Sequence, residues 1–199
     1  PTPIPVIGPS EPNFGIDGAY KESISYMNYA MTYVFCFADG LRRATGEDLF
    51  KEVPDNLLDH AAWSVLAWVE QGKVRQSLVP FGDSGAIPTF PVVYAGLTRN
   101  RHHPLAGWLG ERITPVPQDV RSLIWLDESV PGCEPDTAVP MRVFRDVGQV
   151  VMRRGWGPDT PVAAIKFYQN RGHLDIGTFY LFGGGQPAIV DSGTTPYGS

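Results

Sequence analysis

The chain has 199 residues, of which 43% are hydrophobic and 19% charged, and its formal net charge is −5. This composition excludes a disordered chain, and no apolar run approaches the roughly 20 residues of a membrane helix. A negative chain also lacks the basic face of a general nucleic-acid binder, so neither nucleic acid nor membrane is an expected partner. Two cysteines, Cys36 and Cys133, are too few for a disulfide scaffold, and we expect free thiols.

The first half has helical patterning. Between Glu22 and Ala44, aromatic residues recur at spacings of three and four, which predicts a helix with these residues on one face and Gly46 as its stop. A second helix is predicted over 56–70, ended by Gly72, because its apolar residues fit a 3.6-residue period. Shorter helices are predicted over 88–97 and 104–109.

The second half has strand patterning. Four apolar runs bounded by glycine and proline are predicted strands: 148–152, 162–168, 177–181 and 187–190. No helix separates them, so antiparallel pairing is expected. Helices followed by strands predict an α+β fold, with a boundary region between residues 113 and 140.

The segment 170–179, NRGHLDIGTF, could provide metal ligands. His173 and Asp175 share one face of a strand, and Asp191 follows one hairpin later and could face His173. A zinc site needs at least three protein ligands, so the spacing alone leaves open a hydrogen-bonded structural cluster instead.

The segment 17–29, DGAYKESISYMNY, places Tyr26 and Tyr29 on the first predicted helix. A tyrosine can act as a general acid or base, although its free pKa is roughly 10. A stripe of tyrosines at helical spacing is also typical of core packing, and periodicity does not decide between the two.

Two further groups have ordinary alternatives. In the FGDS loop at 81–84, Asp83 is suited to capping the next element. A basic and aromatic set could bind anionic sugars, since arginine pairs bidentately with carboxylate or sulfate and tryptophan can stack on sugar rings. Surface charge and core packing are the alternatives for its members, which are Arg99, Arg101, His102, His103, Arg153, Arg154, Trp156 and Arg171.

Taken in order, these segments resemble the heparinase II/III-like polysaccharide lyases, a family that includes heparin and heparan lyases and oligoalginate lyases. The family shows Asp-Gly-x-x-x-Glu followed by spaced tyrosines, an aromatic-Gly-Asp-Ser loop, Phe-Arg leading to Met-Arg-x-x-Trp, and a final His-Leu-Asp-x-Gly block followed by Asp-x-Gly. The matching segments are 17–29, 81–84, 144–145, 152–156, 170–179 and 191–193.

The resemblance implies an α/α toroid followed by an antiparallel β-sandwich. Residues 1–115 would be the last helices of an incomplete toroid, 116–140 a linker, and 141–199 the first strands of the sandwich. It further implies a lyase that cleaves uronic-acid glycans by β-elimination, acting on heparin, heparan, another glycosaminoglycan or alginate. The family location implies a secreted or periplasmic protein.

The resemblance also assigns roles to residues. Tyr26 is the first choice for the general acid/base and Tyr29 the second, with Arg171 as a further catalytic candidate. His173 and Asp191 would hold a structural divalent metal, expected to be zinc. The implied substrate-binding residues are Glu22, Asn170, Arg154 and Trp156.

Three departures from the family pattern leave a second function open. Arg171 stands where the family has a histidine, and arginine is a poor base. Ser23 replaces the glycine after Glu22. The toroid helices expected before Asp17 and the third metal ligand expected after the last strand are absent from this sequence. The alternative is therefore a catalytically degenerate, carbohydrate-binding protein, and the third possibility is a structural fragment. In each case we expect exposed apolar faces that the remainder of the polypeptide or another chain covers.

Overall fold

The computed structural model describes residues 13–82, 84, 91–113, 120–167 and 176–191. Its helices are α1 (Ile24–Thr45), the 3₁₀ helix η1 (Leu49–Glu52), α2 (Asp59–Trp63), α3 (Pro91–Arg101), α4 (Pro104–Ile113) and α5 (Val120–Trp125). Its strands are β1 (Val65–Glu70), β2 (Lys73–Leu78), β3 (Met141–Phe144), β4 (Gln149–Arg153), β5 (Val162–Lys166), β6 (Phe179–Gly183) and β7 (Gln186–Ile189).

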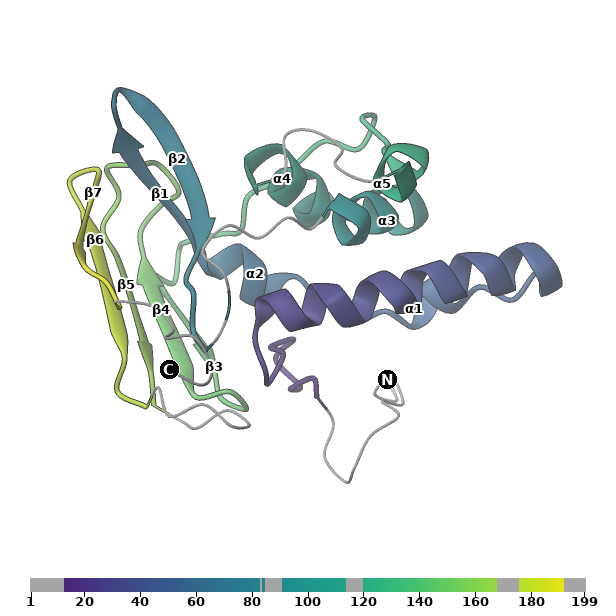
Figure 1. Cartoon of the computed structure of the whole chain (residues 1–199), viewed down its shortest axis with the longest axis horizontal. Helices are drawn as coiled ribbons and strands as arrows, with labels where there is room; N and C mark the ends of the chain where they lie inside the picture. Colours follow the sequence, from purple (N-terminus) through teal and green to yellow (C-terminus); the bar gives the residue numbers. More distant parts are fainter. Residues whose placement is uncertain (1–12, 83, 85–90, 114–119, 168–175, 192–199) are drawn as a thin grey trace, which may run out of the picture.

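The strands form two antiparallel sheets. β1 and β2 make a hairpin, and the other sheet has five strands in the order β3-β4-β5-β6-β7. Figure 1 shows this sheet at one end of the molecule and the helices at the other, with α1 extending away from the sheet. The fold is therefore mixed α+β, and the antiparallel pairing is as predicted.

Helix α1 forms where the sequence predicts it. The side chain of Ser23 accepts a hydrogen bond from the Tyr26 N–H at its start, and Gly46 ends it in the left-handed conformation, at φ 82°. Ile24, Met27, Met31, Phe35 and Ala38 form the buried face. The aromatic stripe lies on the opposite, exposed face, so it is not the core stripe that its spacing also allowed.

The predicted helix over 56–70 is wrong. Only α2 is helical, and the chain then turns into the β1–β2 hairpin. Gln71 and Gly72 both have positive φ, 51° and 72°, as a two-residue type I′ hairpin turn requires, so Gly72 is part of a turn and does not stop a helix. The first apolar residues fit a helix, whereas the valines after Ser64 favour a strand once a turn and a pairing partner follow. Strand structure therefore begins well before residue 113.

The other predicted helices and strands agree more closely with the structure. Helices α3 and α4 overlap the predicted helices at 88–97 and 104–109, and β4 to β7 overlap the four predicted strands. Helix α5 and strand β3 were not predicted. Neither carries a distinctive pattern, because α5 has only 6 residues and β3 only 4.

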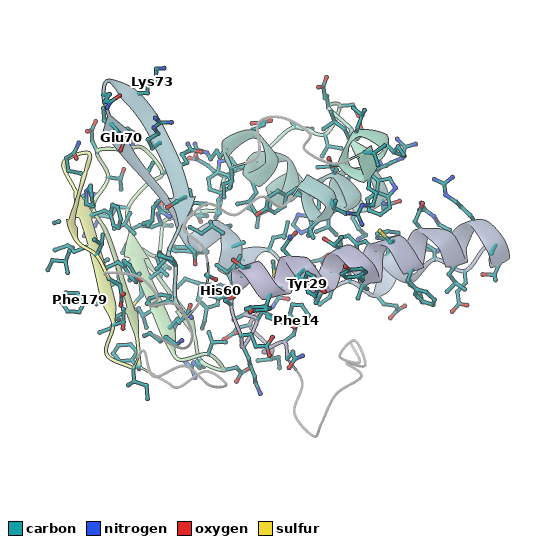
Figure 2. All side chains as sticks on the ribbon, in the orientation of Figure 1. Phe14, Tyr29, His60, Glu70, Lys73 and Phe179 are labelled. Carbon is teal, nitrogen blue, oxygen red and sulfur yellow. The ribbon has the colours of Figure 1, made fainter. Side chains whose placement is uncertain are left out.

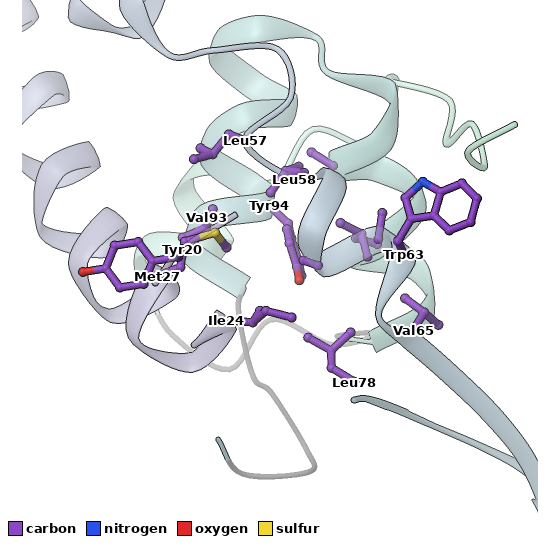
Figure 3. Packing of buried hydrophobic residues seen from close by; sticks show 14 of the residues in the cluster. Tyr20, Ile24, Met27, Leu57, Leu58, Trp63, Val65, Leu78, Val93 and Tyr94 are labelled. Atoms are coloured by element: carbon purple, nitrogen blue, oxygen red, sulfur yellow. The ribbon is translucent and has the colours of Figure 1, made fainter. Parts of the chain in front are cut away.

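The core joins the helices to the hairpin and the sheet. Figure 3 shows Ile24 and Met27 of α1, Trp63 of α2 and Leu78 of β2 among its members. Three tryptophans extend this core to the sheet: the Trp156 ring lies 5.8 Å from Trp63 and 4.8 Å from Trp108, centroid to centroid.

The five-stranded sheet is apolar on the face turned away from this core. The register places five residues in one row across the strands and four in the next: Met141, Met152, Ala163, Leu181 and Ile189, then Val143, Val150, Ile165 and Phe179. Six of these nine side chains are strongly exposed. An antiparallel sheet that faces water normally alternates apolar-in and polar-out, and this one does not.

Two smaller expectations can be checked. Cys36 and Cys133 are both free, as predicted. None of the helices in the described ranges is both long enough and apolar enough to cross a membrane.

Candidate functional site

Among the described residues, one end of the five-stranded sheet lies near four that the sequence selected: Glu22, Tyr26, Tyr29 and Asp191. The β3–β4 turn (residues 145–148), the end of β5 and the start of β6 meet there, because Gln149 pairs with Lys166 and Ile165 with Phe179. The backbone N–H of Phe167 also donates to the Gly148 carbonyl at 2.6 Å, which places the end of β5 against the turn.

Three of the predicted residues, Asn170, Arg171 and His173, lie outside the described residues. The chain leaves β5 at Phe167 and is described again from Ile176, and both flanks lie at this end of the sheet. Asp191 is exposed and follows β7 in the same direction, two residues beyond Ile189, which pairs with Leu181.

The start of α1 lies at this end too. The Asp17 carboxylate accepts a hydrogen bond from the Arg145 backbone N–H in the β3–β4 turn, at 2.6 Å. Glu22 is half-buried just before the helix. Phe14 lies close to the first turn of α1, with Tyr29 farther along the helix (Figure 2).

Tyr26 and Tyr29 share the exposed face of α1, with 41% and 63% of their surface exposed. Tyr26 is in the first helical turn, where the positive end of the helix dipole favours negative charge. Tyr29 contacts Tyr33 edge-to-face at 5.2 Å, and the hydrogen bond between them raises the pKa of Tyr29. Both phenols can therefore meet a large external ligand.

Beneath this end lies a buried polar group that the sequence analysis did not select. His60 Nε2 is 2.6 Å from Gln149 Oε1, its ring lies 4.8 Å from that of Phe144, and Lys166 nearby is fully buried. Burial lowers the pKa of His60 to about 4, with Lys166 lowering it further and Gln149 and Asp17 opposing. The available signal was strand alternation, which puts Gln149 and Lys166 on the inward face.

Arg154 and Trp156 are not part of this constellation. Both follow β4 at the opposite end from the β3–β4 turn, about 13 Å away along the strand. Trp156 is only 4% exposed and donates from its indole N–H to the Pro135 carbonyl. Its position favours the core-packing alternative over sugar stacking.

Arg153, another member of the basic and aromatic set, is also structural and is not exposed to bind a sugar. The Arg153 guanidinium is buried over the Trp156 ring, 3.9 Å from its centroid, and donates to the carbonyls of Trp63 and Gly155 at 3.1 and 3.0 Å. Burial lowers the pKa of Arg153 to about 9, with Arg112 adding to the effect. This arginine joins the sheet to the chain between α2 and β1.

The other predicted groups also have structural contacts. Phe81 of the FGDS loop is buried, with its ring 5.3 Å from that of Tyr180, while Asp83 lies outside the described residues. Arg101 donates to the carbonyls of Phe50 and Val53 at 2.8 and 2.7 Å, and so ties α3 to the chain after η1.

The described residues do not by themselves form a metal site. Over residues 13–82, 84, 91–113, 120–167 and 176–191, no group of three His, Cys, Asp or Glu side chains could hold an ion. Only Asp191 of the two predicted ligands falls within these ranges. The zinc expectation therefore stays a prediction, and no chemical step is derived from it.

Comparisons with known proteins give a structural likeness but no sequence match. No family model and no curated protein sequence matches the chain. A crystal structure of heparinase III superposes with a TM-score of 0.56 at 20% identity, covering 91% of this chain and 28% of that one.

Two further structures agree with the first. A mutant of the heparan sulfate lyase HepC from Pedobacter heparinus gives a TM-score of 0.56 at 19% identity, covering 94% of this chain and 27% of its own. The heparinase III described as the BT4657 gene product gives 0.55 at 18% identity, with the same two coverages. The chain thus spans little more than a quarter of the length of these proteins, and at these identities the likeness concerns the fold. Over nearly its whole length, this chain has the fold of the matched part of heparinase III.

Proposed function

We propose that this chain is part of a polysaccharide lyase that cleaves uronic-acid glycans by β-elimination. The observation that carries the proposal is the superposition on heparinase III over at least 91% of the chain, with the tyrosine helix leading into the sheet end just described. Because those structures are of heparinase III and of a heparan sulfate lyase, heparan-type glycans are the first substrates to test, with other glycosaminoglycans and alginate next.

The chemistry explains the residue types. The proton at C5 of a uronate is very weakly acidic, so its removal requires groups that neutralise the adjacent carboxylate and stabilise the enolate-like state. A base then takes this proton, and an acid protonates the departing O4 oxygen. We assign the acid/base role first to Tyr26, because it is exposed in the first turn of α1, next to the sheet end.

Tyr29 is the second candidate, because it lies on the same exposed face of α1 as Tyr26. Arg171, Asn170 and Glu22 are proposed to face the uronate carboxylate or a neighbouring sugar.

A structural divalent ion held by His173 and Asp191, expected to be zinc, belongs to the same proposal. An imidazole nitrogen and a carboxylate oxygen are both suitable zinc ligands. Its support is that Asp191 follows β7 at the end of the sheet where β5 ends and β6 begins. We propose a secreted or periplasmic location on the family resemblance alone.

Further polypeptide is proposed to cover the apolar faces. Helix α1 is apolar on both sides, α5 exposes Val120, Leu123 and Ile124, and the outer face of the sheet is apolar throughout. A helix or sheet that is apolar on both sides belongs in the interior of a larger structure. An incomplete toroid would leave the helical faces exposed, and an incomplete β-sandwich the sheet face, with a second sheet about 10 Å away as the expected cover.

The test is an activity assay on the polypeptide with its flanking sequence. Cleavage creates an unsaturated uronate that absorbs in the ultraviolet. We expect Tyr26→Phe to lower kcat by about 100-fold or more, which is the usual contribution of a general acid/base. The matched control, Tyr33→Phe, removes a hydroxyl from the same face of α1 and should change kcat only a few-fold. Absence of turnover on heparin, heparan, chondroitin and alginate would contradict the proposal.

The alternative function is a degenerate lyase that binds its glycan without cleaving it. The observation that favours it is Arg171, which stands where a histidine is expected and can bind a carboxylate but not accept its neighbour's proton. Tight oligosaccharide binding without turnover would support this alternative, as would activity gained in Arg171→His. Turnover by the unmodified polypeptide would exclude it.

A further inference from the structure

Two turns far apart in sequence are joined by a reciprocal pair of hydrogen bonds, in which an aspartate of each turn accepts from a backbone N–H of the other. The Asp17 carboxylate, from the loop 13–20, accepts from the Arg145 backbone N–H at 2.6 Å. In return the Asp146 carboxylate, from the β3–β4 turn, accepts from the Ile16 backbone N–H at 2.9 Å. Hydrogen bonds from an N–H to an ionised carboxylate are stronger than neutral ones, and here two such bonds join the same pair of turns.

Two glycines of the loop 13–20 lie where a side chain would clash, Gly15 against the β3–β4 turn and Gly18 against the chain before α2. A Cβ atom added to Gly15 would lie 2.6 Å from the Asp146 carboxylate, and one added to Gly18 would lie 2.0 Å from the Asn56 carbonyl. Asn56, in the chain before α2, also holds the loop 13–20, because its side-chain amide donates to the Ile16 carbonyl at 3.0 Å. The sequence FGIDG at 14–18 is therefore fitted to this contact.

The loop 13–20 is itself held in a single arrangement. Phe14 and Tyr20 form an antiparallel bridge with their rings edge-to-face at 4.9 Å, and the Gly15 N–H donates to the Ala19 carbonyl at 2.8 Å. Tyr20 is buried, and only three residues separate it from Ile24, the first residue of α1. Whatever fixes this loop also fixes where α1 begins.

We propose that Asp17 and Asp146 form a reciprocal clasp whose role is to position α1 against the five-stranded sheet. The clasp is also connected to the end of β5, because the Gly148 carbonyl in the β3–β4 turn accepts a hydrogen bond from the Phe167 N–H. The clasp stands on its own contacts; that it thereby positions Tyr26 for catalysis rests on the proposed function.

Amide hydrogen exchange tests the clasp directly. In Asp146→Ala the Ile16 amide should exchange at least 10-fold faster, and in Asp17→Ala the Arg145 amide should do so. Asp17→Asn and Asp146→Asn keep an oxygen acceptor and should give smaller increases in the exchange rates of these amides. These two variants also provide the test if an alanine variant does not fold. Asp136→Ala is the matched control, since Asp136 accepts from Ala138 within its own loop. Unchanged exchange at Ile16 and Arg145 would overturn the clasp.

A distance measurement separates positioning from local packing. Spin labels at Ala44 on α1 and Ala188 on β7, both exposed, report the orientation of the helix relative to the sheet in a chain whose Cys36 and Cys133 are replaced by alanine. We expect one narrow distance distribution in this chain and in Asp136→Ala, and a clearly broader one in the doubly substituted Asp17→Ala, Asp146→Ala chain. An equally narrow distribution in the latter would show that the clasp does not position α1.

The activity arm distinguishes this inference from the proposed function. In the polypeptide with its flanking sequence, Asp17→Ala should lower kcat at least 10-fold with little change in KM, and Asp17→Asn should restore part of the loss. If the unmodified polypeptide has no lyase activity, the proposed function fails while exchange and distance still test the clasp. If activity is present and Asp17→Ala leaves kcat unchanged, the clasp does not position the catalytic tyrosine.

Discussion

The buried His60 should make the stability of this protein depend on pH in a specific window. Its ring lies between α2 and the sheet, against Gln149, Phe144 and the buried Lys166, and the Asp17 carboxylate acts on it electrostatically in the opposite sense to Lys166. Burial lowers its pKa to about 4 in the folded state, against an ordinary value of 6.5 in the unfolded chain. Protonation therefore favours the unfolded chain, and the stabilisation that is complete above pH 6.5 is lost progressively as the pH falls towards 4.

The magnitude follows from these two values. Between pH 7 and pH 5 the unfolded chain takes up most of a proton at this site while the folded chain takes up little, which lowers the free energy of unfolding by about 2 kcal/mol. Replacing His60 with glutamine removes the titration and retains an amide that can donate to Gln149. The variant should therefore lose about 2 kcal/mol less than the unmodified chain over the same pH interval.

Urea unfolding followed by tryptophan fluorescence at pH 7 and pH 5 measures this difference. The carboxylates titrate in both chains, so their contribution to the pH dependence of the free energy of unfolding cancels when the two chains are compared. His102→Asn is the matched control, because His102 is exposed and its positive φ of 49° is tolerated by asparagine. Parallel pH dependences of the unmodified chain and His60→Gln would refute the reasoning.

Three further predictions concern packing. Gly18→Ala should lower the free energy of unfolding by about 3 kcal/mol or more, because the left-handed backbone and the 2.0 Å approach to the Asn56 carbonyl both oppose a Cβ atom. Gly40→Ala, in open space on α1, should instead raise the free energy of unfolding by about 0.5–1 kcal/mol. Urea unfolding measures both changes, and equal effects of the two substitutions would contradict the clash argued for Gly18. Trp156→Ala should cost about 3–5 kcal/mol in the same experiment, while unchanged stability with weakened glycan binding would show that the ring contacts sugar instead. Met152→Lys, on the outer face of the sheet, should reduce self-association of the 199-residue chain in sedimentation velocity and change its free energy of unfolding by less than about 0.5 kcal/mol. A large loss of free energy of unfolding would show that this face is already covered.

Local pattern was a good guide where one element could form by itself. Helix α1 was predicted from its period and its Gly46 stop, because both are local features. The hairpin β1–β2 was mistaken for a helix because a short apolar run fits both periods, and only pairing across the Gln71–Gly72 turn selects the strand. The candidate site divides in the same way: spacing placed Tyr26 and Tyr29 on one helical face and family resemblance gave them a role, whereas Trp156 and Arg153 proved to be core residues because burial depends on what packs against them.

The sequence by itself determined the α+β class, the antiparallel strands, the two tyrosine candidates and the likeness to heparinase, since each depends on residue order and local preference. Only the tertiary structure decided which polar residues lie inside and which distant turns meet. The pairing of His60 with Gln149 spans 89 positions, and Asp17 meets Arg145 across 128. Contacts at such separations depend on how every intervening element packs, so no local pattern encodes them. The same packing decides where the exposed apolar surface that the sequence led us to expect is found, and one such surface is the outer face of the five-stranded sheet.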